Sequence, residues 1–334
     1  MGRHDFGRAQ DQGYVHVQGE VMNDGFLGIL RLIAVAIQNV GFAVIVGALL
    51  SSQWLARGDS TWQADVGRRL VLTVRMASTL ALLASVLSFW AHCALMSEST
   101  LLEAGPAVWS MLVGTGFGHA WLVAAVFMVC VVVLALLRSG SDGSFPTGIW
   151  LALAAVALAR SNGGHPVDSG LFSLPVWVDW LHLLAISAWV GLVLVTTYVV
   201  MPRLLDAPGS ERQTSASFVQ SLSDTSTYAL VILFSTGAYN GWRGVSTPAN
   251  LWTSTYGQIL LLKFVLVLVA AALGGHNRFF EMPTLMSTLK NPAQEVPTVP
   301  LRRFSTVLHV ESLILLGVLM VAAVLVSSPL PGTT

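Results

Sequence analysis

The segment Trp177–Leu192 reads W-V-D-W-L-H-L-L-A-I-S-A-W-V-G-L. It opens an uncharged run from Trp180 to Pro202 that is long enough to span a bilayer. Asp179 and His182 lie three residues apart in it, so a helix would bring both side chains to one face. A carboxylate one turn before a histidine can hold the imidazole in one tautomer. An ionisable pair at the mouth of a membrane helix is expensive to place there and indicates a functional site. The alternative is that both side chains are merely solvated among lipid headgroups.

The composition is that of a membrane protein with several spanning helices. Of the 334 residues, 54% are hydrophobic and only 10% are charged, whereas soluble domains carry about 25% charged residues. The net charge of zero argues against nucleic acid as a partner, and two cysteines cannot form a disulfide framework. The absence of a P-loop motif and of a complete nucleophile–base–orienter set favours a transporter over an ATP-driven pump or a hydrolase.

Apolar runs predict an all-α bundle of about eight transmembrane helices embedded in the lipid bilayer. They cover approximately Phe26–Leu50, Leu70–His92, Ala107–Leu137, Pro146–Ala159, Val176–Met201, Tyr228–Trp242, Tyr256–Gly275 and Thr306–Val326. The fourth is short enough to be tilted or partly re-entrant. We expect a polar N-terminal tail over residues 1–24, either disordered or foreign to the natural protein. A four-helix half over 25–160 and a second four-helix half over 161–331 would follow.

The positions of Lys and Arg predict the orientation, because basic residues are enriched in cytoplasmic loops. Most of them fall in the loops after the first, third, fifth and seventh spans: Arg57, Arg68, Arg69, Arg75, Arg138, Arg203, Arg212, Arg278, Lys290, Arg302 and Arg303. These loops are therefore expected in the cytoplasm, with both chain termini outside.

With this topology, several histidine and sulfur side chains reach one depth near the outer face, roughly 25 to 31 Å above the inner surface. The set is His92, Cys93, Met96, Met111, His119, His165 and His182. Imidazole, thiolate and thioether together suit copper, and sulfur selects Cu(I). A helix that continues to Met96 would bring this residue near His92 and Cys93. The depth matching predicts a copper site. The alternative for each residue is an ordinary interfacial or apolar side chain that needs no metal.

Heme b is a competing use of paired histidines. Its two axial ligands would come from facing helices at equal depth. His92 with His119 or His182 could do this at the outer side, and His276 with His309 at the inner side. The resulting alternative is a membrane oxidoreductase of the cytochrome b type.

Short sequence elements follow one another over roughly His165–Pro331. In order they are Gly164-His165, Asp179-x-x-His182-Leu-Leu-Ala, Trp189-Val-Gly191, Thr236-Gly-x-x-Asn240, Tyr256-Gly-x-x-Leu-Leu-Leu-Lys263, Gly274-x-x-Asn277-Arg278-Phe279, Glu311 and Leu325-Val-Ser-Ser-Pro329. In order and spacing this half resembles the copper resistance protein D family of bacterial inner-membrane proteins. The chain departs from the family pattern at Leu192, where the family often has a second glycine.

The resemblance implies eight spans in the inner membrane, which would make the outer face periplasmic. It implies a role in copper homeostasis and resistance, with copper ions bound at the periplasmic face and transported inward. The expected partner is a separate periplasmic copper-binding protein of the copper resistance C type. A second alternative is a copper-delivery or assembly factor without transport.

The resemblance gives candidate metal roles to His165 and His182, with Asp179 in support. The roles of His92, Cys93, Met96 and His119 rest on the depth matching alone. Glu311, within the last span, is a possible relay for protons or for a cation, or a simple helix–helix contact.

Overall fold

The computed structural model describes residues 5–56, 60–138, 147–164, 168–289, 298–328 and 331, with side chains from Gly25 onward except at Thr298. All regular elements among these residues are helical, so the predicted all-α class is confirmed. The helices are α1 (Asp5–Leu55), α2 (Thr61–Met96), α3 (Gly105–Gly114), α4 (Gly116–Leu137), α5 (Thr147–Asn162), α6 (Leu174–Val195), α7 (Met201–Leu205), α8 (Arg212–Val245), α9 (Asn250–Thr253), α10 (Thr255–His276), α11 (Met282–Leu289) and α12 (Thr298–Ser327).

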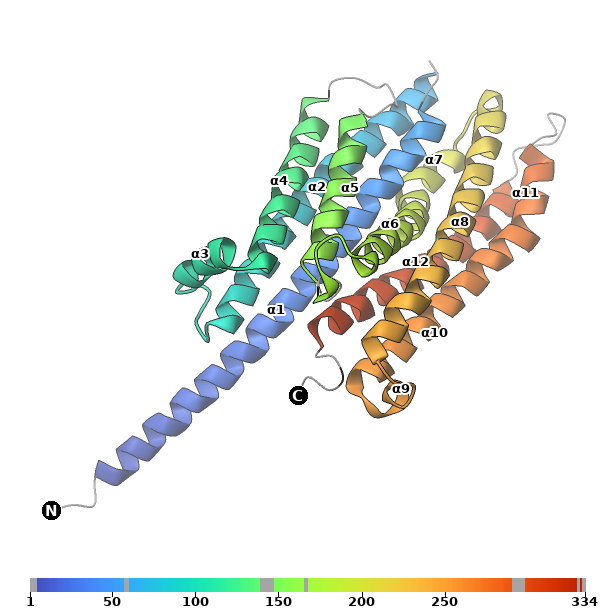
Figure 1. Ribbon diagram of the computed structural model, residues 1–334. Helices are drawn as coiled ribbons and strands as arrows, with labels where there is room; N and C mark the ends of the chain where they lie inside the picture. The colour runs from blue at the N-terminus through green and yellow to red at the C-terminus, as the bar shows by residue number, and fades with distance from the viewer. Residues whose placement is uncertain are drawn as a thin grey trace.

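Six helical stretches in the described part of the chain have the length and hydropathy needed to cross a membrane. They are Gly25–Leu55, Thr61–Met96, Gly116–Leu137, Leu174–Leu205, Thr255–Leu289 and Val299–Ser327. The two remaining predicted spans correspond to α5, which is short at 16 residues, and to α8, which is long but more polar. Both lie alongside the apolar helices in the bundle (Figure 1). The protein is therefore a multi-pass membrane protein.

The third predicted span is divided, which corrects the prediction of one continuous helix over Ala107–Leu137. Thr115 separates α3 from α4 because its backbone is extended, with φ −128° and ψ 147°. Its hydroxyl accepts a hydrogen bond from the Gly118 amide at 2.9 Å and so caps α4. In consequence α3 lies beside the end of α4 instead of extending it (Figure 1).

Two spans contain a widened π-helical turn next to a proline. The turn Thr196–Val200 joins α6 to α7, and the turn Asn277–Glu281 joins α10 to α11. Pro202 and Pro283 follow these turns. A proline inside a helix lacks the amide hydrogen and clashes with the carbonyl four residues earlier, so a wider turn relieves the conflict.

Helix α6 is the centre of the bundle. In the span Leu174–Leu205, which begins with α6, 72% of the most apolar stretch is buried inside the protein. In the span Thr255–Leu289, which contains α10, the corresponding share is 11%. Gly191 and Gly47 allow α6 to pack directly on α1, because a Cβ on either glycine would overlap the backbone of the other helix. Asp179 and His182 therefore lie in the first half of the helix that opens the most enclosed of the spans in the described part of the chain.

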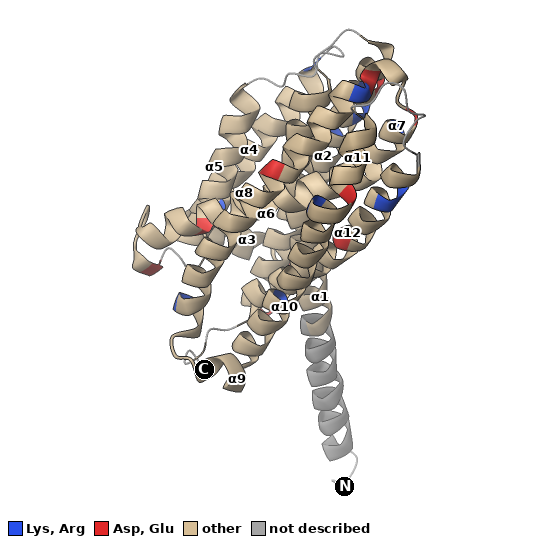
Figure 2. Ribbon diagram, turned by 90° about the vertical axis from the view of Figure 1, so that its right-hand side faces the viewer, with Lys and Arg blue, Asp and Glu red and all other residues tan. Residues whose placement is uncertain are grey.

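The two ends of the bundle differ in charge. One end, which we call the arginine-rich end, joins the α1–α2 and α7–α8 connections. There Asp65 forms ion pairs with Arg68, Arg69 and Arg203 at 3.2, 3.1 and 3.6 Å. Charged residues are sparse along the rest of the bundle (Figure 2). The opposite, arginine-poor end contains α3 and the first turns of α6 (Figure 1).

Candidate functional site

Asp179 joins three helices near the arginine-poor end. Its Oδ2 atom accepts a hydrogen bond of 2.8 Å from the Ser161 hydroxyl of α5. Its Oδ1 atom accepts one of 3.2 Å from the Asn240 side-chain amide of α8. Both carboxylate oxygens therefore have donors, and these bonds hold α5 and α8 against the first turns of α6.

Two cations interact electrostatically with the same carboxylate, namely Arg160 of α5 and Lys263 of α10. The Arg160 guanidinium donates to Asn39 Oδ1 of α1 at 2.5 Å and lies 5.9 Å from the ring centroid of Phe42. Lys263 is half-buried and reaches this cluster electrostatically. The cluster thus combines one carboxylate with two cations, and five helices contribute to it.

His182 has a defined hydrogen-bonding partner on α8. Its Nδ1 atom lies 3.0 Å from Thr236 Oγ1, and the same hydroxyl donates to the Ile232 carbonyl oxygen at 2.7 Å. Because a hydroxyl has one hydrogen and Thr236 directs its own to a backbone carbonyl, this arrangement favours acceptance from His182 and hence an imidazole proton on Nδ1. The Nε2 atom then carries a lone pair, which is the form in which imidazole binds a metal ion.

Among the contacts of the described residues there is no hydrogen bond from Asp179 to His182, and the orienting role of Asp179 stays a prediction. Helical spacing brings the two residues to one side of α6, but the carboxylate oxygens bond Ser161 and Asn240, and Thr236 orients the imidazole. The orienting group belongs to another helix 54 residues further along the chain.

The other predicted ligands divide into separate groups. His165 lies outside the described residues. His92 of α2 packs edge-on against Phe117 with ring centroids 5.1 Å apart, while exposed His119 has its Nε2 atom 3.2 Å from the Val113 carbonyl oxygen. Within the described residues, no three His, Cys, Asp or Glu side chains gather closely enough to hold one metal ion.

Cys93 contacts a different methionine from the one expected. Met96 is 63% exposed, whereas buried Cys93 has its Sγ atom 3.5 Å from Met111 Sδ on α3. The break at Thr115 turns α3 back beside the end of α2 and makes this contact possible. Depth matching had grouped Met111 with the other sulfur residues, but no sequence pattern predicted its pairing with Cys93.

Glu311 is buried inside the bundle, with a relative exposure of 2%. Its Oε1 atom accepts a hydrogen bond of 3.1 Å from the indole nitrogen of Trp189 on α6. Gly274 of α10 makes room for the carboxylate, because a Cβ there would lie 3.2 Å from the same oxygen. This carboxyl group therefore joins three helices in the interior.

The two histidines predicted for the inner side are both exposed. His276 lies 3.6 Å from Glu281 and stacks on Phe280. His309 has Nδ1 2.7 Å from the Ser305 carbonyl oxygen and packs edge-on against Tyr198.

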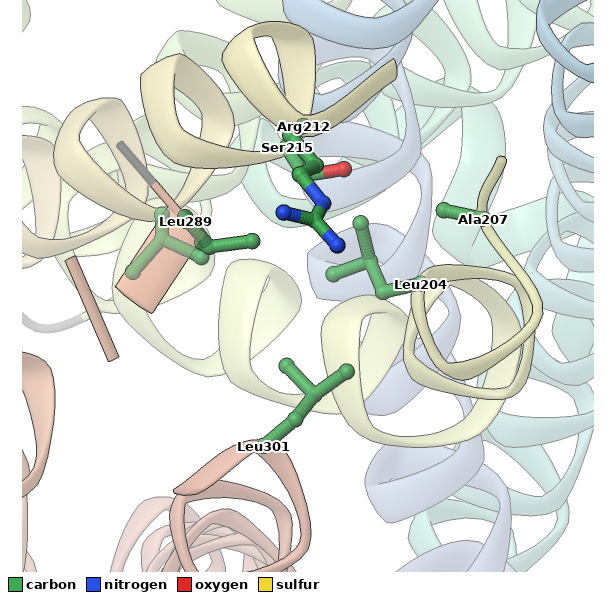
Figure 3. Close-up of a pocket in the computed structure, with 7 residues that line it drawn as sticks. Leu204, Ala207, Arg212, Ser215, Leu289 and Leu301 are labelled. Carbon is green, nitrogen blue, oxygen red and sulfur yellow. The ribbon is translucent and has the colours of Figure 1, made fainter. Parts of the chain in front are cut away.

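A small pocket lies at the arginine-rich end, where α7, α8, α11 and α12 meet (Figure 3). It is lined by Leu204, Ala207, Arg212, Ser215, Val219, Leu289 and Leu301. The lining is mainly aliphatic, and the Ser215 hydroxyl is already bonded to the Glu211 carbonyl oxygen at 2.9 Å. No group of metal ligands surrounds this pocket.

Comparison with known families covers both halves of the chain. The family model described as copper resistance protein D matches residues 216–325. The model described as the copper resistance protein D-like N-terminal domain matches residues 22–169. The chain belongs to the copper resistance protein D family. The proposed resemblance is therefore confirmed, and it extends to the N-terminal half, where no family element had been recognised.

Two curated proteins are similar to this member of the copper resistance protein D family. One is the inner membrane protein YebZ of Escherichia coli K12, 21% identical over 72% of this chain and 81% of its own length. The other is the copper transport protein CutJ of Bacillus subtilis 168, 26% identical over 48% of this chain and 30% of its own length. No solved structure matches the chain significantly.

The sequence patterns did not identify Ser161, Arg160 and Asn240 as partners of Asp179. They also did not identify Thr236 as the partner of the His182 imidazole. One signal was available. Thr236 and Asn240 are four residues apart, so both lie on one face of α8, and both belong to a family element.

Proposed function

We propose that the protein takes up copper ions at the arginine-poor end of the bundle and carries them inward across the bacterial inner membrane. Membership of the copper resistance protein D family supports a role with copper, and one relative is named a copper transport protein. The other relative is named an inner membrane protein. The distribution of basic loops favours a periplasmic location for this end, where a periplasmic copper-binding protein would be the donor.

The single observation that carries the proposal is the state of His182. Thr236 engages its Nδ1 atom, which leaves Nε2 with a lone pair that can bind a metal ion. A histidine with one nitrogen fixed by a neighbour and the other unprotonated is the usual arrangement of a metal ligand. We assign His182 as the first copper ligand of the C-terminal half, with His165 as its companion.

Asp179 supplies the negative charge of this cluster. A copper ion bound by His182 adds positive charge beside Arg160 and Lys263, which interact electrostatically with Asp179. The carboxylate therefore offsets part of the repulsion, and its two fixed hydrogen bonds keep it in place. In this proposal Asp179 contributes its charge and holds the helices in position, whereas Thr236 orients the imidazole ring of His182.

A route toward the arginine-rich end follows α6. Trp189 lies about two turns, or ~10 Å, beyond His182 on this helix, and its indole donates to buried Glu311. A carboxylate at that depth offers the next oxygen ligand for a descending cation or a carrier for a counter-moving proton. We therefore propose Glu311 as the relay between the two ends.

Uptake of copper into proteoliposomes tests this function. Wild type, His182→Ala and His276→Ala would be reconstituted, and copper would be offered as Cu(II) and, separately, as Cu(I) with ascorbate. We expect wild type and His276→Ala to take up copper above empty vesicles in at least one series, and His182→Ala to lose that uptake. Wild-type uptake equal to empty vesicles in both series would refute transport. Equal loss in both variants would refute the assigned site.

A further inference from the structure

Two sulfur atoms meet where α2, α3 and α4 come together. Cys93 Sγ lies 3.5 Å from Met111 Sδ. Cys93 is fully buried at the end of α2, whereas Met111 is half-buried on α3. At this distance a thiol can make a weak hydrogen bond to a thioether, and the two atoms are also close enough to share one metal ion.

The backbone fixes the position of Met111. The Thr115 hydroxyl donates to the Met111 carbonyl oxygen at 2.8 Å. Gly118 lets α3 lie against the start of α4, because a Cβ there would overlap the same carbonyl group. The turn at Thr115 therefore holds Met111 beside α2.

A cluster of aromatic side chains fixes the position of α2, the helix that carries Cys93. Phe89 of α2 stacks on Trp121 of α4 with centroids 4.2 Å apart, and the Trp121 indole donates to the Ser85 hydroxyl at 3.1 Å. Phe117 packs between Phe89 and His92. These contacts lock α2 to α4, so the sulfur pair sits on a rigid support, as a preorganised site requires.

We propose that Cys93 and Met111 form a binding site for a soft monovalent cation, Cu(I) or its analogue Ag(I). Thiolate and thioether are the ligands that select Cu(I). With metal–sulfur bonds of ~2.3 Å, two sulfurs 3.5 Å apart subtend about 100° at the metal, which leaves a further coordination position for exchange. When the metal binds, the Cys93 thiol releases its proton to solvent and the thiolate and thioether each donate an electron pair.

The pair is reachable from the arginine-poor end of the bundle. Cys93 itself is enclosed, but α3 has no buried residue, so Met111 forms the outer side of the site. Methionine is unbranched and adaptable, which suits a ligand that first meets an incoming ion. This inference deepens the proposed function and rests on it only in taking copper as the cargo; it places a Cu(I) site in the N-terminal half, separate from His182.

Competition binding tests the site on the purified full-length protein in detergent. Cu(I) would be held by ascorbate under nitrogen and titrated against a chromogenic Cu(I) chelator. Cys93→Ser and Met111→Leu are the test variants. Cys130→Ser and Met76→Leu are matched controls, because Cys130 and Met76 are both exposed. We expect at least about tenfold weaker Cu(I) binding at one site in each test variant and wild-type binding in both controls.

X-ray absorption on Cu(I)-loaded Cys130→Ser protein gives a second readout that does not depend on how the test variants fold. We expect two sulfur neighbours at ~2.3 Å from copper. Wild-type affinity in both test variants, equal loss in the controls, or a copper spectrum without sulfur would reduce the pair to a packing contact and overturn the proposal. Cu(I) bound by the sulfur pair in a protein that transports no copper would refute the proposed function and leave this site standing.

Discussion

Replacing Thr236 by valine tests the assigned state of His182 with little change in shape. Valine fills nearly the same volume but lacks the hydroxyl that lies 3.0 Å from His182 Nδ1. The variant leaves the ring N–H without its acceptor and lets the tautomers interconvert. Loss of a partner that orients a metal-binding histidine typically weakens metal affinity by about 10- to 100-fold, equivalent to ~1.4 to 2.8 kcal/mol. An unsatisfied buried donor costs a similar amount, ~1 to 3 kcal/mol.

The assay is copper competition binding in a Cys93→Ser background, which removes the proposed sulfur site. Thr236→Ser keeps the hydroxyl and is expected to bind like the parent. Thr227→Val is the matched control on α8, because the Thr227 hydroxyl is exposed and bonds only the Ser223 carbonyl oxygen. Copper affinity of Thr236→Val within twofold of the parent, for both Cu(II) and Cu(I), would refute the tautomer assignment.

Three further predictions concern packing, the interior carboxyl group and acid stability. Gly191→Ala forces α6 away from the α1 backbone, and we expect it to lower the free energy of unfolding by about 1–3 kcal/mol in thermal melts. Glu311→Gln keeps an acceptor for the Trp189 indole but removes the charge, so uptake should fall by on the order of tenfold while copper binding persists. Burial raises the pKa of Glu211, but hydrogen bonds, including one from Gln63, outweigh burial and hold this pKa below its usual value. Its stabilisation is therefore present above pH ~4.3 and lost as the pH falls through the lowered pKa, so Gln63→Leu should unfold at a higher pH in acid titrations.

Matched controls make these outcomes informative. Gly275→Ala should leave stability unchanged, because nothing lies within 4 Å of a Cβ there; equal melting of both glycine variants would contradict the packing explanation. Glu103→Gln changes an exposed carboxylate that bonds Thr100 and should not affect uptake. If Glu311→Gln transports like wild type, the relay is wrong. If Gln63→Leu and wild type unfold at the same acid pH, the hydrogen bond from Gln63 to Glu211 does not contribute to acid stability.

The all-α, multi-pass class could be predicted because a bilayer requires long apolar runs, and six of the eight predicted spans are long and apolar enough to cross it in the described part of the chain. The break at Thr115 was missed because α3 is itself strongly apolar, so hydropathy does not separate it from the span that follows. Its signal was local, a threonine between Gly114 and Gly116 that can cap the next helix. By length and hydropathy alone, α5 and α8 do not count as membrane spans, because α5 is too short and α8 is too polar.

The site was harder to predict because its contacts join distant parts of the chain. Helical spacing correctly brings Asp179 and His182 to one region of α6, yet it cannot reveal which donors occupy the carboxylate. Those donors lie 18 and 61 residues away, at Ser161 and Asn240. The same limit applies to Cys93, whose nearest methionine in sequence points outward while Met111 returns to it through the α3–α4 turn.

The most direct measurement is the copper content of purified protein after equilibrium dialysis, for Cys93→Ser alone and combined with either His182→Ala or His276→Ala. We predict that the parent and the His276 variant retain copper that the His182 variant lacks. Copper retention in the His182 variant equal to that of the parent would contradict the assignment of His182 as the copper ligand.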